Sequence, residues 1–380
     1  MSAASEVLPY FFLHNSLAAS DIQACLLFAA EHFPNHLIQP VAQQGGCSYT
    51  LVAERQAGQQ TVCSLPDATD DEAELHKKTI IQFRLLKHAL PIRTARAASR
   101  LYIPLAPKTR ELGHITVSNA ISSQVCVMQF IPGERFSEVQ PQKPSLSPTI
   151  LELYGVFMTS LGTFFATSWS TGQSYTNPLQ ACTGKIGSTL LSRLATLSQR
   201  LPSRALRERA RETLVAGESG VLNSLPVSLT HGDLLPHNIL VDPQTWRVEG
   251  IIDWAEAEDL PHGINLYALE HLLGYLDVRS ARRPRFVYYA EAAQLRNVFW
   301  TAFRQQVPGC AWSSREVQTA MGVARDVGCL LWHGFAWDNG SVDRVINTVD
   351  DGEELACLEA FLGLEAKGGA RHDSVVEMKV

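Results

Sequence analysis

The segment 227–254 constrains the fold most, because it contains two short apolar runs separated by a turn. The runs, 239–241 and 248–252, are rich in Ile, Leu and Val, which favour strands. Between them stands Asp242-Pro243, a pair typical of turns. The sequence therefore predicts a β-hairpin in the second half of the chain.

Polar side chains flank both strands of this predicted hairpin. Asn238 stands at the start of the first strand and Asp253 at the end of the second, so antiparallel pairing brings them together. Asp233 lies in the loop before Asn238. Phosphoryl transfer needs a carboxylate that orients the attacking hydroxyl, and oxygen ligands that hold Mg²⁺ against nucleotide phosphates. We therefore assign Asp233 as the catalytic base, and Asn238 and Asp253 as metal ligands.

The pattern H-G-D-x-x-x-x-N followed by I-I-D-W, within residues 231–254, resembles the aminoglycoside phosphotransferase and choline kinase-like family, relatives of the protein kinases. Protein kinases carry H-R-D-x-x-x-x-N and D-F-G at these positions, whereas this chain has Gly232 and Asp253-Trp254. It also lacks an A-P-E segment after Asp253, which argues against a polypeptide acceptor. The run V-C-V-M-Q-F-I-P-G-E at 125–134 resembles the family's last small-lobe strand and hinge.

The resemblance implies a fold of the α+β class, with two lobes as in protein kinases. A small, β-rich N-lobe would bind the nucleotide, and a larger, mainly helical C-lobe would carry catalysis and the acceptor site. We expect the N-lobe at 1–134, after an N-terminal helical segment. We expect the C-lobe at 135–366 and a polar tail at 367–380.

The resemblance also implies ATP and Mg²⁺ as cofactors. The nucleotide would contact two segments of the N-lobe, a glycine turn ahead of the strand predicted at 48–54 and the hinge after the strand predicted at 125–131. The residues assigned to the nucleotide are Gly45, Gly46, Ser48, Gln129, Phe130 and Ile131.

The N-lobe departs from the family pattern where a strand cation and a helix Glu should form an ion pair. With a strand at 60–65 and a helix at 72–90, Ser64 takes the place of the cation, and Glu74 comes about one turn too early. Two interpretations stay open: another basic residue contacts the phosphates, or phosphate handling has weakened and the chemistry has drifted. The basic residues available for the first interpretation are Lys77, Lys78 and Arg84.

Charge and composition exclude several partners. The net charge is −6, and no Lys or Arg run provides an electrostatic footprint for nucleic acid. No window of about 18 uninterrupted apolar residues predicts a membrane span, and no basic segment at the N-terminus predicts a secretory signal. The eight cysteines show no C-x-x-C spacing, so we expect reduced thiols and no zinc site. These features predict a cytoplasmic protein with a small-molecule acceptor, and they leave its oligomeric state undefined.

The function predicted is a small-molecule phosphotransferase that moves the γ-phosphate of ATP to a hydroxyl or amine of an unidentified metabolite. The alternative is a kinase-fold protein that no longer phosphorylates, either a nucleotide-binding pseudoenzyme or a protein with a repurposed cleft. Acidic residues after the hairpin would either neutralise a cationic acceptor or form an ordinary solvated face. These residues are Glu256, Glu258, Asp259 and Glu270.

Overall fold

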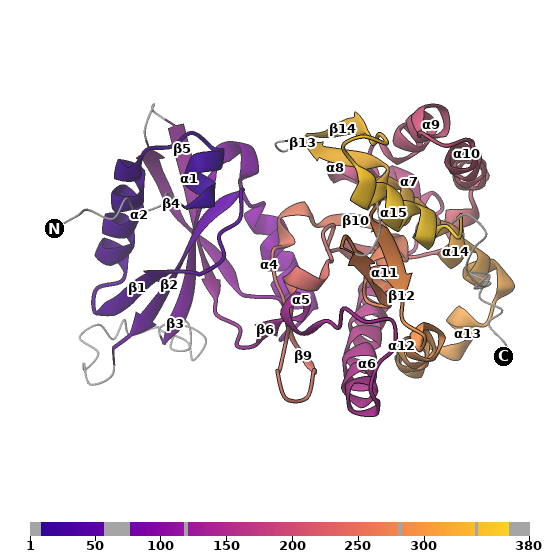
Figure 1. Cartoon of the computed structure of the whole chain (residues 1–380), viewed down its shortest axis with the longest axis horizontal. Helices are drawn as coiled ribbons and strands as arrows, with labels where there is room; N and C mark the ends of the chain where they lie inside the picture. The colour runs from indigo at the N-terminus through magenta and orange to yellow at the C-terminus, as the bar shows by residue number, and fades with distance from the viewer. Residues whose placement is uncertain (1–8, 57–76, 118–120, 280–282, 339–340, 365–380) are drawn as a thin grey trace. The chain divides into compact units, whose positions relative to one another are not determined.

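The computed structural model describes residues 9–56, 77–117, 121–279, 283–338 and 341–364 (Figure 1). The chain divides into two compact units, with the boundary between Pro132 and Gly133.

The first unit is rich in strands. Its elements are α1 (Tyr10–His14), α2 (Ala19–His32), β1 (His36–Pro40), β2 (Ser48–Arg55), β3 (Lys78–Leu85), η1 (Leu86–His88), α4 (Ile92–Leu101), β4 (Thr109–Val117) and β5 (Ile121–Gln129).

The second unit is mainly helical. Its helices are α5 (Phe136–Val139), α6 (Pro148–Thr171), α7 (Pro178–Ala181), α8 (Gly184–Gly187), α9 (Leu190–Arg200), α10 (Arg204–Glu218), η3 (Val221–Ser224), η4 (Pro236–Asn238), η5 (Trp254–Glu256), η6 (Ile264–Leu266), α11 (Tyr267–His271), α12 (Ala292–Gln306), α13 (Gly309–Trp312), α14 (Arg315–His333) and α15 (Gly352–Phe361). Its strands are β6 (Glu134–Arg135), β7 (Val227–Thr230), β8 (Ile239–Val241), β9 (Val248–Ile251), β10 (Glu258–Pro261), β11 (Gly274–Asp277), β12 (Arg285–Tyr288), β13 (Phe335–Asp338) and β14 (Ser341–Val345). The α+β class expected from the sequence is confirmed.

In the described part of the first unit, β1, β2, β3, β5 and β4 form one antiparallel sheet in that order. Helices α1 and α2 pack on one face of this sheet (Figure 1). Alternate residues of β3, Ile81, Phe83 and Leu85, enter the core on that face with Phe12 of α1 and Ala29 of α2. Side chains alternate between the two faces of a strand, so the remaining β3 residues lie on the opposite face.

Strand β3 corrects the helix predicted at 72–90. Residues 78–85 pair with β2 on one side and β5 on the other, which makes them a central strand of the sheet. Their apolar residues alternate with polar ones, the period-2 pattern of a strand, and the prediction overlooked this period. The strand predicted at 60–65 lies outside the described residues, as does Ser64.

Helix α6 forms the centre of the second unit's core. Ser147 caps it by accepting a hydrogen bond from the Ile150 N–H (3.3 Å), and Pro148 occupies its first turn. Among the described helices, α6 is long and apolar enough to cross a membrane by length and composition alone. A buried core helix meets the same criterion, and Phe157 and Phe165 of α6 are fully buried, the latter against Phe299 of α12.

Small antiparallel sheets interrupt the helices of the second unit. Among the described residues, β8 lies between β6 and β9, while β7 pairs with β10 and β11 with β12. In the chain, β11 and β12 lie between α11, which ends at His271, and α12, which begins at Ala292. Gly274 explains the strand pairing, because a Cβ there would lie 2.3 Å from the Val287 carbonyl oxygen.

Candidate functional site

The hairpin predicted from the sequence is present as β8 and β9. Ile239 pairs with Ile251, and the Ile252 N–H donates to the Asn238 carbonyl oxygen (2.9 Å), so the pairing extends one step beyond the strands. Asp253 follows directly and has a left-handed backbone (φ 63°, ψ 63°), which turns the chain out of the strand. The start of β8 and the end of β9 therefore lie side by side.

Asn238 connects the hairpin to the loop that contains Asp233. Its Nδ2 donates to the Asp233 carbonyl oxygen (2.8 Å) and to Asp233 Oδ2 (3.0 Å). Asn238 is buried, whereas Asp233 and Asp253 are both partly exposed. The structure thus brings together the three residues that the sequence singled out for catalysis and metal binding.

The electrostatics of this loop raise the pKa of Asp233 to about 8. Burial is the largest cause, and the negative charges of Asp253 and Glu256 add to it. The hydrogen bond from Asn238 acts in the opposite direction, because it stabilises the carboxylate. Two acids placed this close together favour a cation between them.

The donor atoms at this end of the hairpin fit a hard divalent cation. Because Asn238 directs Nδ2 at Asp233, its Oδ1 is the amide atom that remains for a metal. Asp253 adds a carboxylate, and carboxylate and amide oxygens are the ligands that Mg²⁺ prefers. The arrangement therefore fits the predicted Mg²⁺ site, and the ligand roles themselves stay predictions.

His231 holds the catalytic loop against the end of β9. Its Nδ1 accepts a hydrogen bond from the Asp233 N–H (3.2 Å), so its Nε2–H donates to the Ile252 carbonyl oxygen (2.8 Å). Burial is the main reason that its pKa falls to about 4, and the ring is neutral at physiological pH. His231 is consequently a scaffold residue and not a proton carrier.

Gly232 and Tyr267 complete the support of this loop. Gly232 has φ 77°, and a Cβ at this position would lie 1.9 Å from the Glu256 carbonyl oxygen, so only glycine fits. The backbone N–H of Leu234, two residues after Gly232, donates a hydrogen bond to the Tyr267 hydroxyl (3.1 Å). The Tyr267 ring stacks on Trp332, with centroids 5.0 Å apart, which fixes the hydroxyl.

The glycine turn predicted for the nucleotide lies between β1 and β2 of the first unit. The Gln44 side chain closes this connection, since its Oε1 accepts from the Thr50 N–H and its Nε2 donates to the Thr50 carbonyl oxygen, both at 2.8 Å. Gly45 and Gly46 have no positive φ, and a Cβ on Gly45 would meet no atom within 4 Å. Ser48 begins β2. The conformation does not require glycine here, and phosphate contact stays a prediction.

The predicted hinge residues follow the last strand of the first unit. Gln129 ends β5 and accepts a hydrogen bond from the Lys108 N–H (3.4 Å), and Phe130 and Ile131 lead to the unit boundary. Lys78 is engaged nearby, with its Nζ 4.4 Å from the centroid of the Phe130 ring. The contact of this segment with a nucleotide also stays a prediction.

Arg84, one of the three basic residues named above in place of the missing cation, lies on β3. It is buried, and it lies opposite Gln124 of β5 on the face turned away from the α1–α2 core. Its Nε donates to the His88 carbonyl oxygen (2.8 Å) and its Nη1 to Gln82 Oε1 (3.1 Å). Strand β3 pairs with β2, the strand that follows the predicted glycine turn. Arg84 is therefore a candidate for the basic residue that was expected at position 64.

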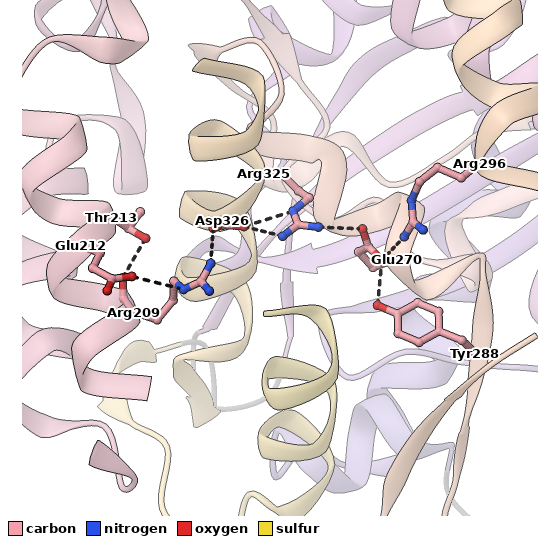
Figure 2. Close-up of polar contacts among 8 residues, drawn as sticks. All are labelled: Arg209, Glu212, Thr213, Glu270, Tyr288, Arg296, Arg325 and Asp326. Atoms are coloured by element: carbon pink, nitrogen blue, oxygen red, sulfur yellow. Dashed lines mark hydrogen bonds and ion pairs between the residues drawn. The ribbon is translucent and has the colours of Figure 1, made fainter. Parts of the chain in front are cut away.

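The acidic residues after the hairpin have partners within the second unit. Glu256 pairs with Lys185 (3.0 Å), and the Glu258 carboxylate accepts from backbone N–H groups of α8, including Gly187 (2.9 Å). Glu270 is fully enclosed among arginines, as Figure 2 shows. These contacts favour structural roles for the three residues over recognition of a cationic acceptor, whereas Asp259 is exposed.

Comparison with known proteins agrees with the motif. Residues 92–261 match the model of the phosphotransferase enzyme family, and this span includes the catalytic loop and Asp253. The family resemblance drawn from the sequence is thereby confirmed. No curated protein sequence matches the chain.

Solved structures with low sequence identity also resemble the chain. One is a macrolide 2'-phosphotransferase from Brachybacterium faecium, with 17% identity, a TM-score of 0.47, and coverage of 92% of this chain and 100% of that chain. Another is an ethanolamine kinase from Plasmodium vivax, with 11% identity, a TM-score of 0.49, and coverage of 96% and 99%.

Proposed function

We propose that this chain, whose residues 92–261 match the phosphotransferase enzyme family, moves the γ-phosphate of ATP to a hydroxyl or amine of a small-molecule acceptor. The observation that carries the proposal is the convergence of Asp233, Asn238 and Asp253 at one end of the β8–β9 hairpin. We also propose a cytoplasmic location, in keeping with the net charge of −6.

In this proposal Asp233 orients the acceptor hydroxyl or amine and takes its proton. Asn238, through Oδ1, and Asp253, through its carboxylate, hold Mg²⁺, which supplies positive charge to the phosphate oxygens during transfer. A cation at Asp253 offsets the charge that helps to raise the pKa of Asp233. Asp233 is then ionised, and able to act as a base, at a lower pH than in the metal-free protein.

For the nucleotide we propose contacts from the turn at Gly45, Gly46 and Ser48, and from the segment Gln129–Ile131. Arg84 is the candidate that replaces the family's strand cation, and its burial on β3 supports this assignment. If Arg84 contacts the phosphates, the Ser at position 64 is no reason to expect a protein that no longer phosphorylates.

The first experiment measures the thermal stability of the full chain with ATP, in the presence and absence of Mg²⁺. The proposal requires Mg²⁺-dependent stabilisation. ATP consumption is then screened against amino-sugars, amino-alcohols and hydroxylated metabolites. No response to ATP under any of these conditions would instead support the alternative, a kinase-fold protein that no longer phosphorylates.

The second experiment replaces Asp233 with Asn. Loss of the base should slow transfer by about 10²–10⁴-fold while stabilisation by ATP and Mg²⁺ is retained. Asp242→Asn is the matched control, because Asp242 accepts hydrogen bonds from Gln244 and Thr245 in the turn of the same hairpin, and an Asn can accept them too. Equal loss of transfer and nucleotide stabilisation in Asp233→Asn would contradict the assigned role.

A further inference from the structure

Three side chains with nitrogen or sulfur donors meet in the second unit, on elements that do not belong to the hairpin. His271 ends α11, His333 ends α14, and Cys357 lies in α15. One donor atom from each residue lies within 4.8 Å of the other two. The donors come from three helices that are far apart in the sequence, so cysteine spacing could not have revealed the cluster.

The cluster is enclosed and the two imidazoles are neutral. His333 and Cys357 are buried, and the ring of Phe361 packs against both histidines, with centroids 5.0 Å from His271 and 5.3 Å from His333. Burial lowers the pKa of His271 to about 4 and holds that of His333 well below its ordinary value. Neutral imidazole is the form that binds metals, so neither ring has to lose a proton.

The hydrogen bond between the two imidazoles leaves one ring nitrogen of the cluster without a partner among the described residues. His271 Nε2 and His333 Nε2 lie 3.0 Å apart and can share one N–H. Among the described residues, His333 Nδ1 is buried and has no hydrogen-bond partner. A buried polar atom without a partner destabilises the folded protein. Either nitrogen of an imidazole can bind a metal, so an ion would give this ring a strong partner that the shared N–H alone does not.

We propose that His271, His333 and Cys357 form a binding site for zinc. Zinc accepts two imidazoles and a thiolate, with bonds of about 2.0–2.1 Å to nitrogen and about 2.3 Å to sulfur, which separates donors by about 3.3–3.6 Å at tetrahedral angles. One donor atom from each residue lies within 4.8 Å of the other two, which is about 1 Å beyond these values. Small side-chain rotations complete the geometry, with water as the fourth ligand.

The chemistry of this site differs from that of the oxygen site at Asn238 and Asp253. Mg²⁺ prefers oxygen donors, whereas a nitrogen and sulfur set selects zinc. Burial raises the pKa of the Cys357 thiol, so the zinc ion displaces the thiol proton and one proton is released for each ion bound. The bound ion fixes α15 to the ends of α11 and α14.

Cobalt is the spectroscopic probe for this site, because a thiolate bound to Co²⁺ gives a charge-transfer absorption that an all-oxygen site lacks. The metal-free full chain is titrated with Co²⁺ in buffer that contains excess Mg²⁺. We expect the absorption to saturate at one equivalent and to disappear when zinc is added. Zinc should also raise the melting temperature of the metal-free chain.

Matched variants locate the site. Cys357→Ser should lose the thiolate absorption, whereas Cys182→Ser should keep it, because Cys182 is another buried thiol of the same unit that donates to the Pro178 carbonyl oxygen, as a Ser can. His271→Asn serves if Cys357→Ser fails to fold, and it should weaken Co²⁺ binding at least tenfold. The proposal is overturned if the wild-type chain shows no thiolate absorption at stoichiometric Co²⁺, or if Cys182→Ser and not Cys357→Ser abolishes it.

Discussion

Two carboxylates of the second unit, the partly exposed Asp233 and the buried Glu270, have opposite electrostatics. Burial and the nearby Asp253 raise the pKa of Asp233 to about 8. Burial acts on Glu270 in the same direction, but Arg296 and Arg325 outweigh it and hold its pKa below the ordinary value. Burial alone therefore does not decide the direction of a pKa shift, because the charges placed beside each acid differ in sign.

Glu270 owes its low pKa to a network that connects four helices (Figure 2). Its carboxylate accepts from Arg296 (2.6 Å), from the Tyr288 hydroxyl (2.8 Å) and from Arg325 (3.4 Å). Arg325 continues to Asp326 (2.6 Å), which in turn accepts from Arg209 of α10 (3.1 Å). The charge of Glu270 is thus balanced by two arginines and a hydroxyl donor, whereas Asp233 lies close to a second acid, Asp253.

The largest expected effect on stability is that of Glu270→Ala. Removing this acid leaves two arginines in a largely buried place with too little negative charge, so the free energy of unfolding should fall by about 3–5 kcal/mol. Urea denaturation followed by circular dichroism measures the change. A loss of less than about 1 kcal/mol would mean that the network relaxes without Glu270. The structural role of Glu270, and with it the contrast with Asp233, would then be wrong.

The pH dependence of stability should differ in sign between the two acids. The pKa of Asp233 rises from 3.8 to about 8 on folding, so its contribution is fully present below 3.8 and is lost as the pH rises through 8. In the metal-free protein, Asp233→Asn should therefore gain in melting temperature relative to wild type as the pH increases over this range.

Glu270 should behave in the opposite way. Its folded pKa lies below 4.5, so its contribution is present above 4.5 and is lost as the pH falls through the lowered value. The melting temperature of Glu270→Gln should consequently approach that of wild type only in acid. Melting curves of wild type and both variants across pH measure the two trends. If the melting temperatures of both variants changed with pH in the same direction relative to wild type, the predicted difference in sign would be contradicted.

The smallest expected effect is that of Glu212→Gln, at the outer end of the same network. The Glu212 side chain is 72% exposed and lies 3.6 Å from Arg209. Solvent screens such a pair, so the free energy of unfolding should change by less than about 1 kcal/mol. A loss as large as that of Glu270→Ala would show that charge number, and not burial, governs the network.

The catalytic loop was predictable because its information is local. The spacing from Asp233 to Asn238, and a turn between two apolar runs, are enough to place Asn238 beside Asp253. Strand β3 was not predicted, because its alternation at 78–85 was interpreted as part of a helix. A central strand is stabilised by its neighbours in the sheet, and the segment alone does not show those neighbours.

The contacts of Glu270 and of the cluster at His271, His333 and Cys357 were beyond prediction for a different reason. Their partners come from helices separated by tens of residues, and nothing in the spacing of the residues indicates that the helices meet. The sequence left two interpretations of Glu270 open, a contact with a cationic acceptor or a solvated acidic face. The solvated face is wrong for Glu270, because its side chain is buried and pairs with Arg296 and Arg325.

The imidazole of His231 forms two hydrogen bonds and also fixes the distance between the two backbone groups that it contacts. Because the ring is rigid, its acceptor nitrogen at the Asp233 N–H and its donor nitrogen at the Ile252 carbonyl remain a fixed distance apart. A Gln at 231 would also offer one acceptor and one donor, yet its extra rotatable bonds would let the loop drift relative to the strand end. The accuracy with which Asp233 faces its neighbours thus depends on the stiffness of one fully buried aromatic ring.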